Sequence, residues 1–189
     1  LSCVVPSGDN SLGVDLGNLV VSLTASNQSS NVLPFSYDRP TLEFVSPRRI
    51  RGTGGDELSL TGVNFGSPSR SYPRSITVDG QICETSGSPI ISSTHPGMTT
   101  VTCVTPPLLV GVRSVSISVS GQSSMSSFDV LSLCPSGYFG MKDESCSICP
   151  SGARCLGGFH DPEPLFGFFQ TSRLQFDECS PRLACLGPS

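Results

Sequence analysis

The chain has 189 residues, a formal net charge of -4, and charged side chains at only 14% of its positions. Nucleic-acid binding requires a basic surface that neutralises phosphates, and the few basic residues here form no long run, so that class of function is disfavoured. No stretch approaches the 18 apolar residues of a membrane-spanning helix.

The first 38 residues predict a strand, a turn and a second strand. Residues 19–24 are β-rich, Ser26 and Asn27 favour a turn, and residues 32–37 form a short closing strand interrupted by a proline. Asn27-Gln28-Ser29 is also an acceptor sequence for N-linked glycosylation. We therefore predict a turn that carries a candidate glycan at Asn27.

Residues 39–131 predict one complete β-sandwich. Asp79-Gly80 between two apolar runs is a strong hairpin signal. Further along, Val115, Ile117 and Val119 alternate with serines, as in a strand that is buried on one face only. Short strands at regular spacing are typical of a sandwich. Strands are expected within residues 41–45, 57–66, 75–78, 81–83, 99–103, 114–120 and 128–130.

An internal repeat links these two regions. Cys3-Val4-Val5-Pro6 returns as Cys103-Val104-Thr105-Pro106, and a β-rich run after each copy ends in Gln-Ser-Ser, at 28–30 and at 122–124. Repeats are informative because each copy adopts the same local structure. We expect residues 1–38 to be the C-terminal part of a preceding domain, and the chain to be a segment of a larger protein.

The cysteines indicate an oxidising compartment. Cys146 and Cys149 have the C-x2-C spacing of a zinc site, but only two histidines are present and no second close cysteine pair exists. Dense cysteines are typical of small secreted domains that need cross-links to fold, so disulfides are the favoured interpretation. Six of the nine cysteines fall in the last 56 residues: Cys134, Cys146, Cys149, Cys155, Cys179 and Cys185.

The predicted sandwich of residues 39–131 resembles the IPT/TIG family of immunoglobulin-like domains, found in plexins, transcription factors and many cell-surface proteins. The resemblance implies a disulfide between Cys83 and Cys103, and it implies that the partner of Cys3 lies about 20 residues upstream. It also implies that residues 1–38 are the C-terminal part of a preceding IPT/TIG domain, so that two such domains stand in tandem. Such a bridge distinguishes extracellular members from DNA-binding ones. The matching segments are 40–47, Gly54-Gly55, 60–66, 76–83 and 101–107.

Residues 132–189 resemble the ephrin-receptor-like and TNF-receptor-like (EGF-like) cysteine-rich modules. Cys134-Pro135-Ser136-Gly137 and Cys149-Pro150-Ser151-Gly152 carry this resemblance, 15 positions apart. Six cysteines allow fifteen connectivities, and sequence does not choose among them. We prefer the local pairs Cys134–Cys146, Cys149–Cys155 and Cys179–Cys185. Phe166, Phe168 and Phe169 either pack against the disulfides or form an exposed patch for a neighbouring subunit.

No catalytic, cofactor or metal site is expected. His95 lies near many serines, but no Gly-x-Ser-x-Gly elbow occurs. His160-Asp161 with Glu163 is better explained as a solvated loop than as a metal site. The acidic residues also lack the dense spacing of a calcium loop.

These features predict a non-enzymatic segment of a secreted or surface-anchored glycoprotein. The first hypothesis is a structural or adhesive role, with rigid sandwiches as spacers and assembly units in an array, matrix or filament, including ciliary or flagellar surface structures. Its partners would be other subunits or copies of itself, with glycans as further candidates. The second hypothesis is the ligand-binding ectodomain of a plexin-like transmembrane receptor. A membrane would be reached only through parts outside this sequence.

Overall fold

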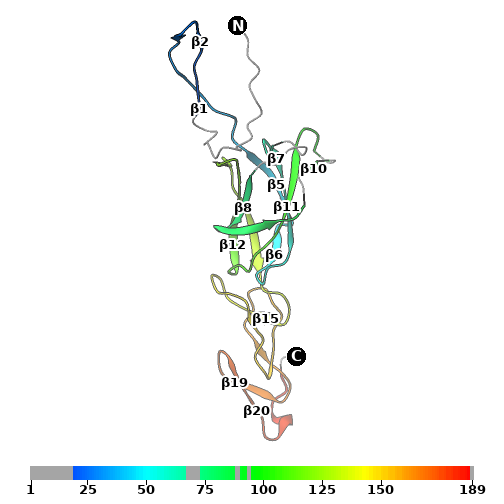
Figure 1. The fold of residues 1–189 in the computed structure, drawn as a ribbon. Coiled ribbons are helices and arrows are strands. Elements are labelled where there is room, and N and C mark those ends of the chain that lie inside the picture. The colour runs from blue at the N-terminus through cyan, green and yellow to red at the C-terminus, as the bar shows by residue number, and fades with distance from the viewer. Residues whose placement is uncertain (1–18, 67–72, 88–89, 93–94, 188–189) are drawn as a thin grey trace. The chain divides into compact units, whose positions relative to one another are not determined.

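The computed structural model describes residues 19–66, 73–87, 90–92 and 95–187, and within these ranges the regular secondary structure is β-strand apart from one short 3-10 helix (Figure 1). The predicted all-β fold is confirmed. Cys3 and the sequence repeat around it lie outside the described residues. A short 3-10 helix covers Arg182–Ala184. The strands are β1 Leu19–Val21, β2 Thr24–Ala25, β3 Gln28–Ser29, β4 Leu33–Phe35, β5 Thr41–Ser46, β6 Arg49–Arg51, β7 Glu57–Val63, β8 Arg74–Val78, β9 Gln81–Thr85, β10 Ile90–Ile91, β11 Thr99–Val104, β12 Gly111–Val119, β13 Gln122–Ser123, β14 Phe128–Leu133, β15 Tyr138–Phe139, β16 Ser147–Ile148, β17 Ala153–Arg154, β18 Glu163–Pro164, β19 Phe168–Ser172 and β20 Gln175–Glu178.

The chain divides into two compact units that do not follow the order of the sequence. The first unit contains Leu1–Ser46, Leu58–Cys103 and Ser114–Phe128. The second contains Pro47–Glu57, Val104–Arg113 and Asp129–Ser189. Two loop regions of the predicted sandwich, residues 47–57 and 104–113, therefore group with the cysteine-rich segment.

The largest sheet has ten strands. Its main path runs β5-β7-β11-β9-β8-β12-β14-β6, while β10 pairs with β11 and β13 pairs with β12. The two end strands of this path, β5 and β6, are consecutive in sequence, with only Pro47 and Arg48 between them. The chain thus leaves one end of the sheet and enters the other at a proline, which cannot donate to a strand ladder. β6 then pairs in parallel with the end of β14.

The core of the first unit follows from side chains that alternate across each strand. On β12, Val115 and Ile117 are buried, whereas Ser114 is exposed and Ser116 and Ser118 are half-buried. These alternating positions agree with the predicted strand. Further buried apolar residues in this unit are Leu42, Val45, Leu58, Leu60, Phe65, Ile76, Val78, Val101 and Val119.

Residues 19–35 form the predicted strand, turn and strand. β1 pairs with β4 and β2 pairs with β3, both antiparallel. Ser26 and Asn27 have φ values of 47° and 63°, the positive values that a two-residue type I′ hairpin turn requires. Asn27 is exposed, as an acceptor for a glycan has to be.

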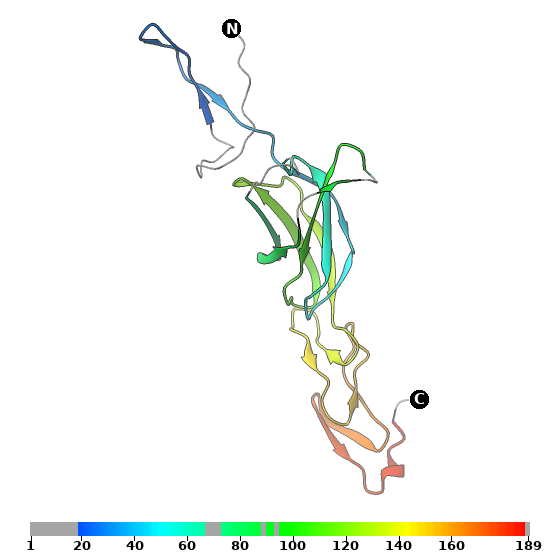
Figure 2. The same ribbon diagram turned by 45° about the vertical axis from the view of Figure 1, so that its right-hand side comes forward.

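Residues 134–187 contain two copies of one motif, a duplication that the sequence analysis did not find. In the first copy, Tyr138 pairs with Ile148. In the second, Phe168 pairs with Glu178, each residue thirty positions further on (138 to 168, 148 to 178). Both copies are hairpins, β15–β16 and β19–β20, which can be followed in Figure 2.

Hydrogen bonds around one glycine confirm that the copies are equivalent. The amide of Cys149 donates to the carbonyl of Gly137 at 3.0 Å, and the amide of Gly137 donates to the carbonyl of Cys155 at 3.0 Å. Thirty positions on, the amide of Cys179 donates to Gly167 at 2.8 Å, and that of Gly167 donates to the carbonyl of Cys185 at 2.9 Å.

The two copies differ at one pair of positions. Cys134 and Cys146 form a disulfide in the first copy, and their counterparts in the second are Pro164 and Phe176. Phe176 is 8% exposed, so a buried aromatic side chain takes the place of half of that disulfide. The Cys149–Cys155 disulfide has a counterpart in Cys179–Cys185, whereas the Cys134–Cys146 disulfide has none, so the cysteine pattern repeats only in part.

Candidate functional site

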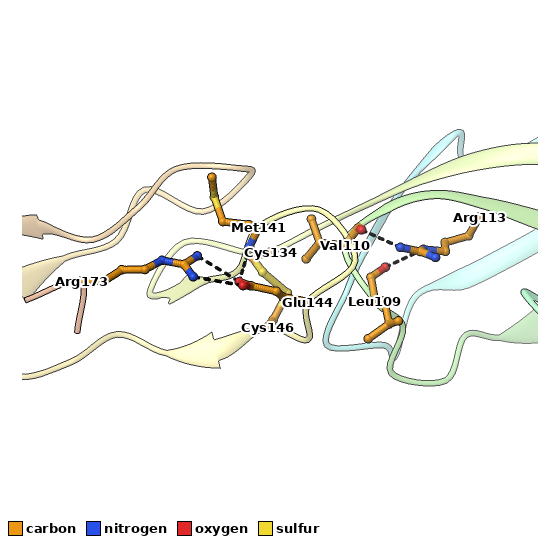
Figure 3. The surroundings of a disulfide bond; sticks show 8 residues. All are labelled: Leu109, Val110, Arg113, Cys134, Met141, Glu144, Cys146 and Arg173. Atoms are coloured by element: carbon orange, nitrogen blue, oxygen red, sulfur yellow. Dashed lines mark hydrogen bonds and ion pairs between the residues drawn. A yellow bond between two sulfur atoms is a disulfide. The ribbon is translucent and has the colours of Figure 1, made fainter.

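The second unit contains residues 140–145, which we call the docking loop. They belong to the chain segment that the Cys134–Cys146 disulfide closes (Figure 3). The loop meets the turn before β12 through its backbone. The amide of Val110 donates to the carbonyl of Glu144 at 2.8 Å, and the amide of Asp143 donates to the carbonyl of Val110 at 2.8 Å. This reciprocal pair fixes the register between the two segments.

A buried arginine reinforces this contact. Arg113 is 8% exposed; its Nη2 donates to the carbonyl of Val110 at 2.7 Å and its Nε donates to the carbonyl of Leu109 at 3.0 Å. The same Nη2 contacts Asp143 Oδ1 of the docking loop at 2.6 Å. A buried guanidinium needs both hydrogen-bond acceptors and a counter-charge. The turn supplies the former and the docking loop supplies the latter.

The disulfide itself packs against the backbone at Gly52. A Cβ atom at Gly52 would lie 2.7 Å from Cys146 Sγ and 3.2 Å from Ser132 Oγ. The Gly52 amide donates to the carbonyl of Leu133 at 2.7 Å, and its carbonyl accepts from the amide of Leu108 at 2.8 Å. The glycine therefore lets three segments of the second unit meet at one point.

An exposed ion-pair network continues from the docking loop to the second motif copy. Arg173 donates from both Nη atoms to the two carboxylate oxygens of Glu144 at 3.0 Å, and its Nε donates to Asp161 Oδ1 at 3.1 Å. The Arg173 side chain, together with the Met141 amide at 2.9 Å, lowers the pKa of Glu144. The two carboxylates in turn raise the pKa of Arg173.

The Arg173→Gln substitution is expected to raise the pKa of Glu144 toward the ordinary glutamate value of about 4.3, because its main cationic partner is removed. A lowered folded-state pKa contributes stability that is present above that ordinary value and is lost as the pH falls through the folded-state pKa. NMR titration of the Glu144 carboxyl carbon would measure the change. The Arg154→Gln control removes a separate exposed pair with Glu163, 3.2 Å apart, and should leave Glu144 unchanged. An unchanged titration in Arg173→Gln would contradict the assignment.

The structure contains four disulfides among its described residues. Cys83 and Cys103 join β9 to β11, and both are almost fully buried. The other three are Cys134–Cys146, Cys149–Cys155 and Cys179–Cys185, all between cysteines close in sequence.

The three phenylalanines of the suggested patch do not share one surface. Phe168 lies against Gly152, where a Cβ atom would be 2.5 Å from the Phe168 ring. Phe169 follows it on the same strand, so its side chain points to the opposite face, where it is 45% exposed. Phe166 precedes the strand and is 53% exposed. Phe166 and Phe169 are exposed, whereas Phe168 is half-buried.

The residues considered for catalysis and metal binding have other surroundings. The His95 ring packs on Phe44 with the centroids 4.3 Å apart. Asp161 pairs with Arg173, and Glu163 pairs with Arg154. In the part of the chain that the structure describes, no three His, Cys, Asp or Glu side chains are grouped as metal ligands. Over the same ranges, no helix has the length and hydrophobicity needed to cross a bilayer.

Sequence reasoning missed Arg113, Glu144 and Arg173. A signal for Arg113 was present, because it continues the inward register of Val115 and Ile117, and a cation at such a position is buried and needs a partner. Glu144 and Arg173 carried no comparable signal, because they lie in segments without a regular pattern.

Comparison with known proteins gave a family match and similar solved structures. Residues 40–131 match the family model "IPT/TIG domain". No curated protein of similar sequence was found. The structure of Yersinia pseudotuberculosis adhesin InvE is similar at 18% sequence identity and a TM-score of 0.36, over 52% of this chain and 28% of the adhesin chain. The alignment thus spans little more than a quarter of that protein.

The family match and the disulfides indicate where this protein works. Disulfides form and persist in oxidising compartments, and four of them beside an immunoglobulin-like domain indicate an extracellular or secreted protein. Residues 40–131 are thus an all-β, disulfide-bonded region that matches the IPT/TIG domain family.

Proposed function

We propose that the chain is a structural and adhesive segment of a large extracellular glycoprotein. Its IPT/TIG sandwich and its cysteine-rich module act as rigid spacers and assembly units in a surface array, matrix or filament, including ciliary or flagellar surface structures. The partners are other protein subunits or further copies of the same protein, and the segment performs no chemistry of its own.

One observation carries this proposal: the connection to the cysteine-rich module is itself part of a sheet. Residues 131–133 pair with Arg49–Arg51, and Cys134 follows directly. Domains in one chain move freely when a flexible linker joins them. Here the paired strand, the disulfide and the ion pair of the buried Arg113 with Asp143 hold the docking loop against residues 104–113. Such a connection transmits position and force, which a spacer has to do.

The rigidity can be measured with two labels inside the second unit. Spin labels attached through keto-bearing amino acids at Val112 and Ile148, which are 60% and 76% exposed, avoid the cysteines. Pulsed electron–electron double resonance should give one narrow peak in the distance between the two labels for the native chain, and a broad peak for Cys134→Ala/Cys146→Ala. The matched control Cys179→Ala/Cys185→Ala removes a disulfide of the second motif copy and should keep the narrow peak. A broad peak in the native chain would contradict the spacer function.

A further inference from the structure

The N-terminal hairpin reproduces a hairpin of the complete sandwich, bond for bond, 94 positions apart. The amide of Ser30 donates to the carbonyl of Leu23 at 2.7 Å, and the amide of Ser124 donates to the carbonyl of Ile117 at 2.8 Å. The amide of Leu23 also donates to Ser30 Oγ at 2.9 Å, as that of Ile117 does to Ser124 Oγ at 3.4 Å. The offset is the same for both partners (23 to 117, 30 to 124), so the two hairpins share one register.

The turns of the two hairpins agree as well. Ser26 and Asn27 have φ values of 47° and 63°, and their counterparts Ser120 and Gly121 have 49° and 84°. Each turn is flanked by the same two-residue ladder, β2–β3 in one hairpin and the β12–β13 pairing in the other. The part of the repeat that relates residues 23–30 to 117–124 is therefore a structural repeat.

The counterpart side chains differ sharply in burial. Val115 and Ile117 are 0% and 1% exposed, whereas Val21 and Leu23 are 49% and 51% exposed. Two β-strands with an uncovered apolar face are only marginally stable in water. The N-terminal hairpin thus has the inner face of a sandwich, and no sheet among the described residues pairs with β1–β4 to cover it.

The complete sandwich shows what covers such a face. In the first unit, β5 and β7 supply Leu42, Leu58 and Leu60, all at most 1% exposed, to the core that buries Val115 and Ile117. A facing sheet with aliphatic side chains at these positions has the shape and chemistry that the exposed hairpin face requires.

The opposite face of the hairpin supports the same assignment. Val20 is the counterpart of Ser114 (20 to 114), which is exposed on the outside of the complete sandwich. In agreement, Val20 is 69% exposed and lies on the face opposite to Val21. Val20 and Val21 therefore form a matched pair of neighbouring valines on the two faces of one strand.

We propose that the face of Val21 and Leu23 is half of the core of a second IPT/TIG sandwich. The other half is a sheet equivalent to β5 and β7 that the same polypeptide supplies N-terminal to this hairpin. The inference deepens the proposed function and rests on it, because it makes the sandwiches consecutive domains of one polypeptide chain.

Hydrogen–deuterium exchange of the full-length protein, isolated from its source, tests the proposal. Peptides covering residues 19–30 should exchange as slowly as peptides covering residues 113–124. In the isolated 189-residue chain, the amides of residues 21–25 should exchange about 100-fold faster than in the full-length protein, since only a packed core gives strong protection. Equal, fast exchange in both proteins would overturn the proposal.

Substitutions on the two faces decide which face is covered. Val21→Asp in the full-length protein should abolish the protection of residues 19–30, while Val20→Asp should leave it within about two-fold, because an exposed substitution on a sheet changes stability little. Equal effects of the two changes would overturn the assignment of the face. Protection that appears in the isolated chain only as its concentration rises would identify a second copy as the occupant, and would also overturn the proposal. A narrow label distance within the second unit, measured as above, would leave the spacer function standing in either case.

Discussion

Replacing both Cys83 and Cys103 by alanine is expected to destabilise the sandwich by about 3 kcal/mol. The bridge closes a loop with a sequence separation of 20 residues between β9 and β11. A cross-link of that span removes about this much conformational freedom from the unfolded chain. Both sulfur atoms are also in the core, where the cysteines are 1% and 0% exposed, so their loss leaves a void that adds to the cost. Urea unfolding followed by circular dichroism should show an earlier transition of the sandwich.

A second disulfide provides the control for this experiment. Cys179→Ala/Cys185→Ala opens a loop with a sequence separation of only 6 residues, in the other compact unit. This double substitution should lower the free energy of unfolding of that unit by about 2 kcal/mol. It should leave the protection of β9 and β11 from hydrogen exchange unchanged. If the sandwich of Cys83→Ala/Cys103→Ala unfolds at the same urea concentration as that of the native chain, the bridge does not stabilise the sandwich.

The Gly62→Ala substitution is expected to destabilise the sandwich by about 3 kcal/mol. A Cβ atom at this position would lie 2.1 Å from the carbonyl oxygen of Thr41 and 2.7 Å from Cζ of Phe65. The first contact is with backbone, which cannot move without breaking the β5–β7 ladder. The second is with a core side chain that is only 1% exposed. Thermal unfolding followed by circular dichroism would measure the loss.

Gly80→Ala is the matched control, because it makes the same chemical change in open space. Gly80 lies in the β8–β9 turn with φ at +79°, and no heavy atom lies within 4 Å of the position of an added Cβ. Gly80→Ala should lower the free energy of unfolding by only about 1 kcal/mol, the strain of an alanine in the left-handed backbone conformation. Equal losses for Gly62→Ala and Gly80→Ala would show that the close approach at Gly62 is not important for stability.

The local structure of the sandwich could be predicted because it depends on neighbouring residues. Alternation of apolar and polar residues at 115–119 predicts a one-sided strand, and Asp79-Gly80 predicts the hairpin that β8 and β9 form. Phe65, next to Asn64 with φ at 62°, is buried in the core. Each of these features is encoded within a few residues of its position.

The candidate site could not be predicted in the same way, because it joins segments that are far apart. Val110, Arg113 and Glu144 meet only when the turn before β12 and the ring of the Cys134–Cys146 disulfide are both formed. Gly52 is needed there because of a sulfur atom 94 positions later in the chain, which no local pattern indicates.

By itself, the sequence determined the all-β class and the strand periodicity, because the alternation of side chains and the conformations of turns are properties of short stretches. It also contained the repeat that relates residues 23–30 to 117–124. Only the tertiary structure decided that residues 47–57 and 104–113 group with the cysteine-rich segment, that Phe168 and Phe169 face opposite ways, and that Phe176 replaces a cysteine in the second motif copy. These features depend on which distant backbones pair, and that pairing is settled by packing and by counter-charges that form only in the folded chain.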